Sequence, residues 1–209
     1  MIDIENVSLA YAGRTGPVLA VEGLGLAVGK GEFAAVVGPS GCGKSTLMKL
    51  VTGLIRPTTG SVRVNGAEVR GPVKIAGMAF QNANLLPWRT VIDNILLPLE
   101  IVEPYRSQFR ARKAEYVARV EELLATVGLQ GFGERFPWEL SGGMQQRASL
   151  CRALIHEPAL LMLDEPFAAL DAFTREELWC VLRDVWQRLK FTVVLVTHDL
   201  REATLDRKS

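Results

Sequence analysis

The chain has 209 residues, of which 48% are hydrophobic, so it is long enough to form one or two globular domains with a substantial core. Its 24 basic and 23 acidic residues leave a net charge of +1, which argues against a nucleic-acid partner. The apolar runs fall far short of the roughly 18 to 20 residues that span a bilayer, and the N-terminus is acidic where a signal peptide would be basic. We therefore expect a cytoplasmic chain that contacts any membrane through a partner.

The first 30 residues alternate apolar and polar side chains, which predicts short β-strands. Ile2 and Ile4 share one phase, whereas Val7 and Leu9 are out of phase with them, which indicates a bulge or a turn. Tyr11 either stacks its ring on a nucleotide base or packs in the core, and the pattern leaves both alternatives open.

The stretch GPSGCGKST, residues 38–46, fits the phosphate-binding pattern Gly-x-x-x-x-Gly-Lys-[Ser/Thr]. An apolar run at residues 33–37 precedes it and a helical pattern follows it, so the motif connects a strand to a helix. The glycines let successive N–H groups point inward, and the helix start adds donors and a positive dipole end. Lys44 is expected to reach the β- and γ-phosphates, and Ser45 to be a ligand of Mg²⁺. The nucleotide-binding residues predicted here are Gly38, Pro39, Ser40, Gly41, Cys42, Gly43, Lys44, Ser45 and Thr46.

Residues 61–64 and 67–69 predict a β-hairpin, because the intervening Asn-Gly pair favours a type I′ turn. A further strand is expected at residues 74–80, and Gln81 follows it. Ligands of α/β sheets collect at the carboxyl ends of strands, so the Gln81 amide could bind Mg²⁺ or an attacking water. The apolar segment at residues 84–89 either packs under a layer of helices or provides a docking surface.

Residues 107–127 have a helical pattern, which Gly128 ends. It interrupts the series of strands and predicts an inserted helical subdomain. Farther on, Ser141 is a good N-cap in the stretch LSGGMQQR, and two glycines follow it at the start of a helix. This predicts a second phosphate site, for a nucleotide held by another copy of the chain, although many helices begin with Ser-Gly and bind nothing.

Residues 159–163 are continuously apolar, as is typical of a central parallel strand, and two carboxylates follow them. Asp164 is expected to hold Mg²⁺, directly or through water, and Glu165 to polarise the water that attacks the γ-phosphate. The alternative is that both cap the next helix. A second apolar strand at residues 192–196 leads to His198, which could hydrogen-bond the γ-phosphate.

Together these motifs resemble the ATP-binding subunit of an ABC transporter over almost the whole chain, and LSGGMQQR is the sharpest of them because P-loop kinases and GTPases lack it. The resemblance implies an α/β fold: a P-loop NTPase (RecA-like) core with an N-terminal antiparallel β subdomain and an inserted helical subdomain. In one ABC ATPase domain, we place the core at residues 1–84 and 158–209 and the helical subdomain at residues 85–157.

The same resemblance implies the roles of individual residues in binding ATP and Mg²⁺. Tyr11 would stack on adenine, Gln81 would sense Mg²⁺ and water, Glu165 would be the catalytic base, and His198 would contact the γ-phosphate. In a head-to-tail homodimer, this chain would contact the ATP that the second ATPase subunit binds. The residues expected at that seam are Ser141, Gly143 and Asp171.

Residues 82–101 and 165–178 further resemble the nitrate, sulfonate and taurine branch of bacterial importers. That implies a peripheral position on the cytoplasmic face of the cell membrane, transmembrane permease subunits as partners, and, indirectly, a periplasmic or extracellular solute-binding protein. The alternatives are a non-transport ABC ATPase of the assembly or repair type and an inactive cassette. One departure is that residues 204–209 are polar where the family continues with an apolar strand and helices, so we expect a truncated C-terminus and an uncovered sheet edge.

Overall fold

The computed structural model describes residues 1–13, 16–39, 41–168 and 170–198, and the expectations for Ser40 and for the C-terminal residues 199–209 lie outside them. The described residues contain no helix that is both long and apolar enough to cross a membrane. In chain order, the elements are β1 (Ile2–Gly13), β2 (Gly16–Val28), β3 (Phe33–Val37), α1 (Lys44–Val51), β4 (Thr59–Val64), β5 (Ala67–Glu68), β6 (Ala76–Ala79), α2 (Val91–Ile101), α3 (Tyr105–Gln108), α4 (Lys113–Thr126), the 3₁₀ helix η1 (Pro137–Glu139), α5 (Gly142–Leu154), β7 (Leu160–Asp164), α6 (Ala172–Leu189) and β8 (Thr192–Thr197).

A parallel sheet with the strand order β3-β8-β7-β6 forms the centre of the molecule. Val37 pairs with Thr197, and Asp164 pairs with Val196, so neighbouring strands end at the same level. The chain leaves the sheet at this edge four times: into the phosphate loop, to Gln81, to Glu165 and to His198. The topology therefore gathers the predicted site residues that follow the strands at one edge of the sheet.

A second, antiparallel sheet has the order β2-β1-β4-β5 and confirms two expectations from the sequence. The register between β1 and β2 shifts at three places from Ile4 to Ala10, which is the irregularity that the phase slip indicates. Asn65 and Gly66 both have positive φ angles, 52° and 79°, as a type I′ turn requires. β6 is shorter than expected, because it spans Ala76–Ala79 rather than residues 74–80.

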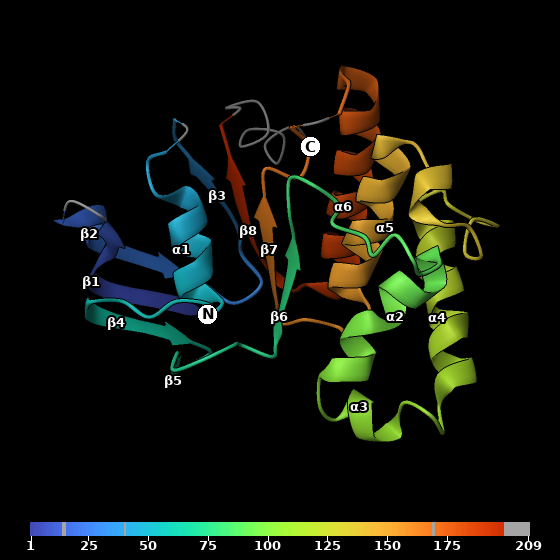
Figure 1. Cartoon of the computed structure of the whole chain (residues 1–209), viewed down its shortest axis with the longest axis horizontal. Coiled ribbons are helices and arrows are strands. Elements are labelled where there is room, and N and C mark those ends of the chain that lie inside the picture. Colours follow the sequence, from blue (N-terminus) through green and yellow to red (C-terminus); the bar gives the residue numbers. More distant parts are fainter. Residues whose placement is uncertain (14–15, 40, 169, 199–209) are drawn as a thin grey trace.

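Alternating side chains of the parallel sheet support two different cores. Leu160 and Met162 of β7 face α1 and the antiparallel sheet, whereas Leu161 and Leu163 pack with α5 and α6. In Figure 1, α1 accordingly lies between the antiparallel strands and the parallel sheet, and α5 and α6 lie on the other side. The predicted strand at residues 159–163 is thus covered on both faces, as its apolar sequence indicates.

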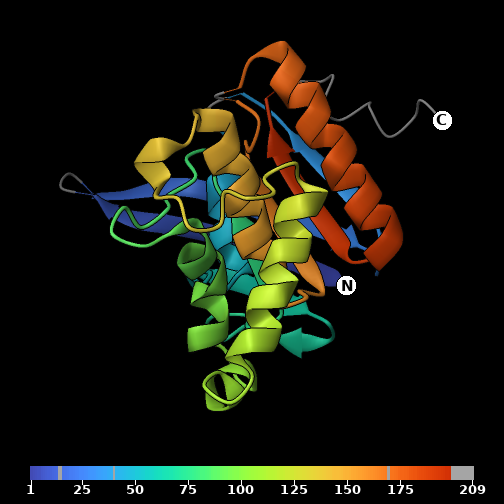
Figure 2. The ribbon, with the colours of Figure 1, turned by 90° about the vertical axis from the view of Figure 1, so that its right-hand side faces the viewer.

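A third core lies among α2, α4 and α5, which lie on the side of the molecule that faces the viewer in Figure 2. The helical pattern of residues 107–127 corresponds mainly to α4, whose buried residues include Tyr116, Val120 and Leu124. Helix α5 contributes to both neighbouring cores, with Leu150 and Leu154 in one and with Ala148 and Cys151 in the other. It therefore packs against the parallel sheet as well as against the other helices of this third core.

Candidate nucleotide-binding and catalytic site

The phosphate loop turns through two glycines in the left-handed region. Gly41 has φ 82°, and Gly43, the N-cap residue of α1, has φ 97°. The ammonium of Lys44 donates hydrogen bonds to the carbonyls of Gly38 and Pro39 at 2.8 and 2.9 Å, which places the charge within the loop. A Cβ on Gly43 would lie 3.0 Å from the carbonyl oxygen of Ala20, so β2 closes the loop on one side. A loop with this turn, donor and charge suits a polyphosphate.

Two oxygen ligands for a hard cation, from Ser45 and Asp164, lie at the end of this loop. The hydroxyl of Ser45 donates to Oδ1 of Asp164 at 3.4 Å. Burial is the main cause that raises the pKa of Asp164, while the Ser45 hydrogen bond lowers it. Mg²⁺ in phosphate sites is held by one or two carboxylates or hydroxyls together with the phosphates, so this pair fits Mg²⁺. The described residues hold no cluster of three or more His, Cys, Asp or Glu side chains that could bind a metal without such phosphates.

Glu165 lies between a cation and an imidazole. One carboxylate oxygen is 3.8 Å from the ammonium of Lys44, and the other is 3.0 Å from Nδ1 of His198. The Glu165 side chain is mostly buried, with 18% exposed, whereas that of His198 is 54% exposed. Two of the predicted catalytic residues, Glu165 and His198, are therefore in direct contact although they are 33 positions apart in the sequence.

The backbone of Glu165 has an unusual conformation for a residue with a side chain. Its φ angle is 46°, in the left-handed region, and its N–H donates to the carbonyl of Val196 at 2.8 Å. Asp164 and Glu165 are therefore not helix caps, because the cap of the next helix, α6, is Asp171. The alternative interpretation of the two carboxylates as caps is wrong.

Gln81 reaches the same edge of the sheet after β6, and its side chain is exposed. Its carbonyl accepts a hydrogen bond from Nε2 of Gln146 at 2.9 Å. Gln146 lies in the LSGGMQQR stretch but was not predicted as a functional residue, because nothing local in the sequence indicates a contact across 65 positions.

The residues predicted for the second phosphate site form a separate hollow. Ser141 is the N-cap of α5, as expected, and its hydroxyl accepts from the N–H of Met144. Gly143 packs against α6 so closely that a Cβ would lie 2.8 Å from Cγ2 of Thr174. Asp171 accepts hydrogen bonds from the N–H groups at the start of α6, which lowers its pKa. The hollow is lined by Gly128, Leu129, Phe132, Ser141, Gly142, Gly143, Met144, Arg147, Leu170, Asp171 and Thr174, and none of these belongs to the phosphate loop.

Tyr11 stands near the far end of the long hairpin that β1 and β2 form. It pairs with Val18, and the two side chains are 40% and 58% exposed, so Tyr11 does not pack in the core. The core alternative is therefore wrong. Within the phosphate loop, Cys42 is exposed and Thr46 is half-buried.

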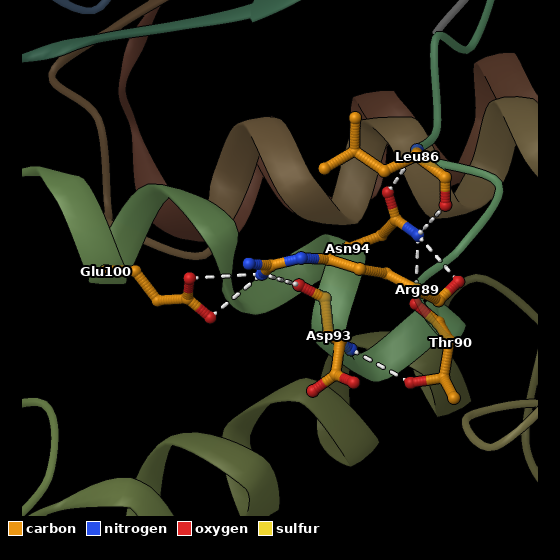
Figure 3. A network of polar contacts seen from close by, with 6 residues as sticks. All are labelled: Leu86, Arg89, Thr90, Asp93, Asn94 and Glu100. Atoms are coloured by element: carbon orange, nitrogen blue, oxygen red, sulfur yellow. Dashed lines mark hydrogen bonds and ion pairs between the residues drawn. The ribbon is translucent and has the colours of Figure 1, made fainter.

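The apolar segment at residues 84–89, just before α2, is hydrogen-bonded to α2 on one side and exposed to solvent on the other. Figure 3 shows the amide of Asn94 bound to both backbone groups of Leu86 and to the carbonyls of Arg89 and Thr90. The guanidinium of Arg89 in turn contacts both carboxylate oxygens of Glu100 at 3.0 Å. The segment thus packs on α2, while Trp88 remains 71% exposed.

The fold and the phosphate loop together define a P-loop NTPase. Residues 21–168 match the family described as ABC transporter, and the chain belongs to that family. It is 43% identical over 203 residues to the taurine import ATP-binding protein TauB of Pseudomonas putida, with 97% of this chain and 74% of that protein covered. It is 48% identical over 183 residues to the aliphatic sulfonates import ATP-binding protein SsuB of Bacillus licheniformis, with 88% and 68% covered.

Solved structures agree with this assignment. The dimeric post-hydrolysis structure of the ATP-binding cassette MJ0796 bound to ADP and Pi has a TM-score of 0.84 and 32% identity, covering 97% of this chain and 90% of that one. A second dimeric structure of the same bacterial ABC transporter cassette matches equally well, with a TM-score of 0.84.

Proposed function

We propose that this chain is the ATP-binding and ATP-hydrolysing subunit of an ABC importer for taurine, an aliphatic sulfonate or a related small solute. The observation that carries the proposal is the meeting of Lys44, Asp164, Glu165 and His198 at one edge of the parallel sheet. The names of the relatives, which are ATP-binding proteins for taurine and sulfonate import, support the choice of solute.

The groups at this edge divide the work of phosphoryl transfer. Lys44 and the loop N–H groups bind the phosphates, while Ser45 and Asp164 hold Mg²⁺, which neutralises the charge that develops during the reaction. Glu165 accepts a proton from the attacking water, and His198 orients that carboxylate and contacts the γ-phosphate. The side-chain amide of Gln81 contacts Mg²⁺ and the attacking water. Tyr11, which is exposed on the β1–β2 hairpin, stacks on the adenine.

A second copy of the chain completes the site. The hollow around Ser141, Gly143 and Asp171 is separate from the phosphate loop, so these residues serve the ATP of a head-to-tail partner. ATP then favours the closed dimer because the γ-phosphate is contacted from both sides, and hydrolysis removes that link. The dimeric form of the solved ABC transporter cassettes supports this arrangement.

A permease is the partner on the helical side. A groove of about 550 Å³ beside β6 is largely apolar and is lined in part by Met78, Phe80, Leu97 and Pro98. Trp88 and Ile101 are exposed, at 71% and 62%. We assign this surface and the segment at residues 81–89 to the permease, which places the chain peripherally on the cytoplasmic membrane face. A solute-binding protein would act on the permease and would not touch this chain.

We retain the division into a core at residues 1–84 and 158–209 and a helical subdomain at residues 85–157 as part of the proposal. Helix α5 is the element that the two parts share, since its side chains pack into both cores. A displacement of the helical subdomain by the permease would therefore reach the catalytic edge through α5.

The experiment that tests this function is Mg²⁺-dependent ATP hydrolysis by the purified chain as a function of protein concentration. We expect activity to rise more steeply than linearly, because two copies form each site. Glu165→Gln should keep ATP binding and lose about a hundredfold or more in rate, since it removes a positioned base. Lys44→Ala should instead weaken ATP binding itself.

Two results would contradict the assignment. Normal hydrolysis by Glu165→Gln would remove that residue from the role of base, and unchanged ATP affinity in Lys44→Ala would contradict the phosphate loop. For the solute, vesicles that carry the chain with its co-purified permease, with the solute-binding protein outside and ATP inside, should take up labelled taurine or an aliphatic sulfonate. The matched control is the same vesicle with Glu165→Gln.

A further inference from the structure

One buried amide connects three segments of the catalytic side of the molecule. Gln146, on the second turn of α5, is only 5% exposed. Its Nε2 lies 2.8 Å from the carbonyl oxygen of Phe80, 2.9 Å from that of Gln81 and 2.9 Å from that of Pro166. An amide nitrogen has two hydrogens, so the three carbonyls share them.

The positions of these carbonyls explain why the contact matters. Phe80 and Gln81 follow β6, and Pro166 follows Glu165 after β7, so Gln146 spans the ends of two neighbouring parallel strands. Glu165 itself is tied on its other side by the hydrogen bond from its N–H to Val196. The turn that carries the carboxylate is thus fixed from both sides, and one of the two attachments comes from α5.

A second side chain of α5 extends the attachment along the chain. The guanidinium of Arg152 donates to the carbonyls of Ala83 and Asn84, at 2.6 and 2.9 Å. Burial lowers the pKa of Arg152, and the two carbonyls accept hydrogen bonds from both terminal nitrogens of its guanidinium. Four of the five carbonyls from residue 80 to residue 84 therefore accept hydrogen bonds from side chains of a single helix.

We propose that Gln146 is a positioning residue that holds Gln81 and Glu165 at a fixed separation and couples both to the Ser141 end of α5. The inference rests on the proposed function and adds to it a direct mechanical link. When a partner subunit contacts Ser141 and Gly143, any shift of α5 moves the backbone of both active-site segments. Because Gln146 is buried and its amide donates to protein carbonyls, we expect its effect on the rate of the chemical step rather than on ATP binding.

The neighbouring Gln145 provides a matched control. Its amide donates to the carbonyls of Pro137 and Leu140, at 3.0 and 3.2 Å, which belong to the turn just before α5. Gln145→Met and Gln146→Met remove the same group from adjacent positions of one helix, but only the second change frees the segments that carry Gln81 and Glu165. Met has nearly the volume of Gln, so packing is largely preserved.

The experiment measures kcat and KM for Mg²⁺-ATP with the full chain, well below the melting temperature. We expect Gln146→Met to lower kcat by about ten- to a hundredfold, the loss that a small misplacement of reacting groups causes, with KM within about twofold of wild type. Gln145→Met should keep kcat within about twofold. If Gln146→Met does not fold, Gln146→Asn decides the matter, because it keeps a buried amide that is one methylene too short to reach the carbonyls.

A double variant separates positioning from a general structural role. If Gln146 acts through the segment of Gln81, the combination of Gln81→Ala and Gln146→Met loses less activity than the product of the two single losses. If the loss of activity in the double variant equals the product of the two single losses, the two residues act independently and the proposal is overturned. A wild-type kcat in the folded Gln146→Met or Gln146→Asn variant would also overturn it. Absence of hydrolysis by the wild-type chain would contradict the proposed function instead, so the two failures are distinguishable.

Discussion

The change Asn94→Ala tests how firmly the segment before α2 is held. Asn94 is fully buried and makes four hydrogen bonds to backbone groups of residues 86, 89 and 90. Two of the carbonyls keep another donor, because the N–H of Arg89 bonds to Leu86 and that of Asn94 bonds to Thr90. The N–H of Leu86 and the carbonyl of Arg89 lose the partner that the amide provides. Each costs about 1–3 kcal/mol if left unsatisfied, so we expect a loss of about 2–4 kcal/mol, since water reaches part of the site.

For a chain of this length, such a loss lowers the melting temperature by about 5–15 °C. Thermal unfolding followed by circular dichroism measures it, with Asn82→Ala as the matched control, because Asn82 lies in the same connection and is exposed. The control should melt within about 1 °C of wild type, as surface substitutions do. A melting temperature of Asn94→Ala within about 2 °C of wild type would refute the reasoning that the buried amide holds this segment.

Two further predictions concern ionisable groups of the site. Burial raises the pKa of Asp164, so at neutral pH its charge disfavours the folded state. Asp164→Asn should therefore raise the melting temperature by a few degrees at pH 7. The same change should abolish Mg²⁺-dependent hydrolysis. That gain should shrink as the pH falls through the raised pKa, and a gain that is independent of pH would exclude this cause. Iodoacetamide at pH 8 should label Cys42, which is exposed, much faster than Cys151, whose buried thiol has its pKa raised to about 12. Mass spectrometry of the native chain measures both rates, and ATP should slow the labelling of Cys42.

Local patterns in the sequence predicted the elements that carry the site. Apolar runs at residues 33–37, 159–163 and 192–196 correspond to β3, β7 and β8 within one residue at either end. The runs of β7 and β8 are continuous because these two strands are buried on both faces. The Asn65-Gly66 turn and the Ser141 cap were equally predictable, since each depends on the chemistry of a few neighbouring residues. Helix α2 was not predicted, because it is apolar on most sides and contains Pro98.

Contacts between distant segments could not be predicted in the same way. Neither Asn94 nor Gln146 differs locally from a solvent-facing amide, and what gives each a role is a set of carbonyls that the fold brings to it. The contact of His198 with Glu165 also follows only from the parallel pairing of β7 and β8, since neither strand specifies its neighbour by itself.

The backbone of Glu165 shows how the fold accepts strain at this site. A left-handed conformation costs a residue with a Cβ about 1 kcal/mol or more, and glycine would avoid that cost. Here φ is 46°, and the hydrogen bonds of its N–H to Val196 and of Gln146 to Pro166 hold the turn in place. With this turn, the carboxylate contacts both Lys44 and His198, which glycine could not do. The strain is therefore retained because the position needs a carboxylate, and Gln146 is one of the groups that offsets its cost.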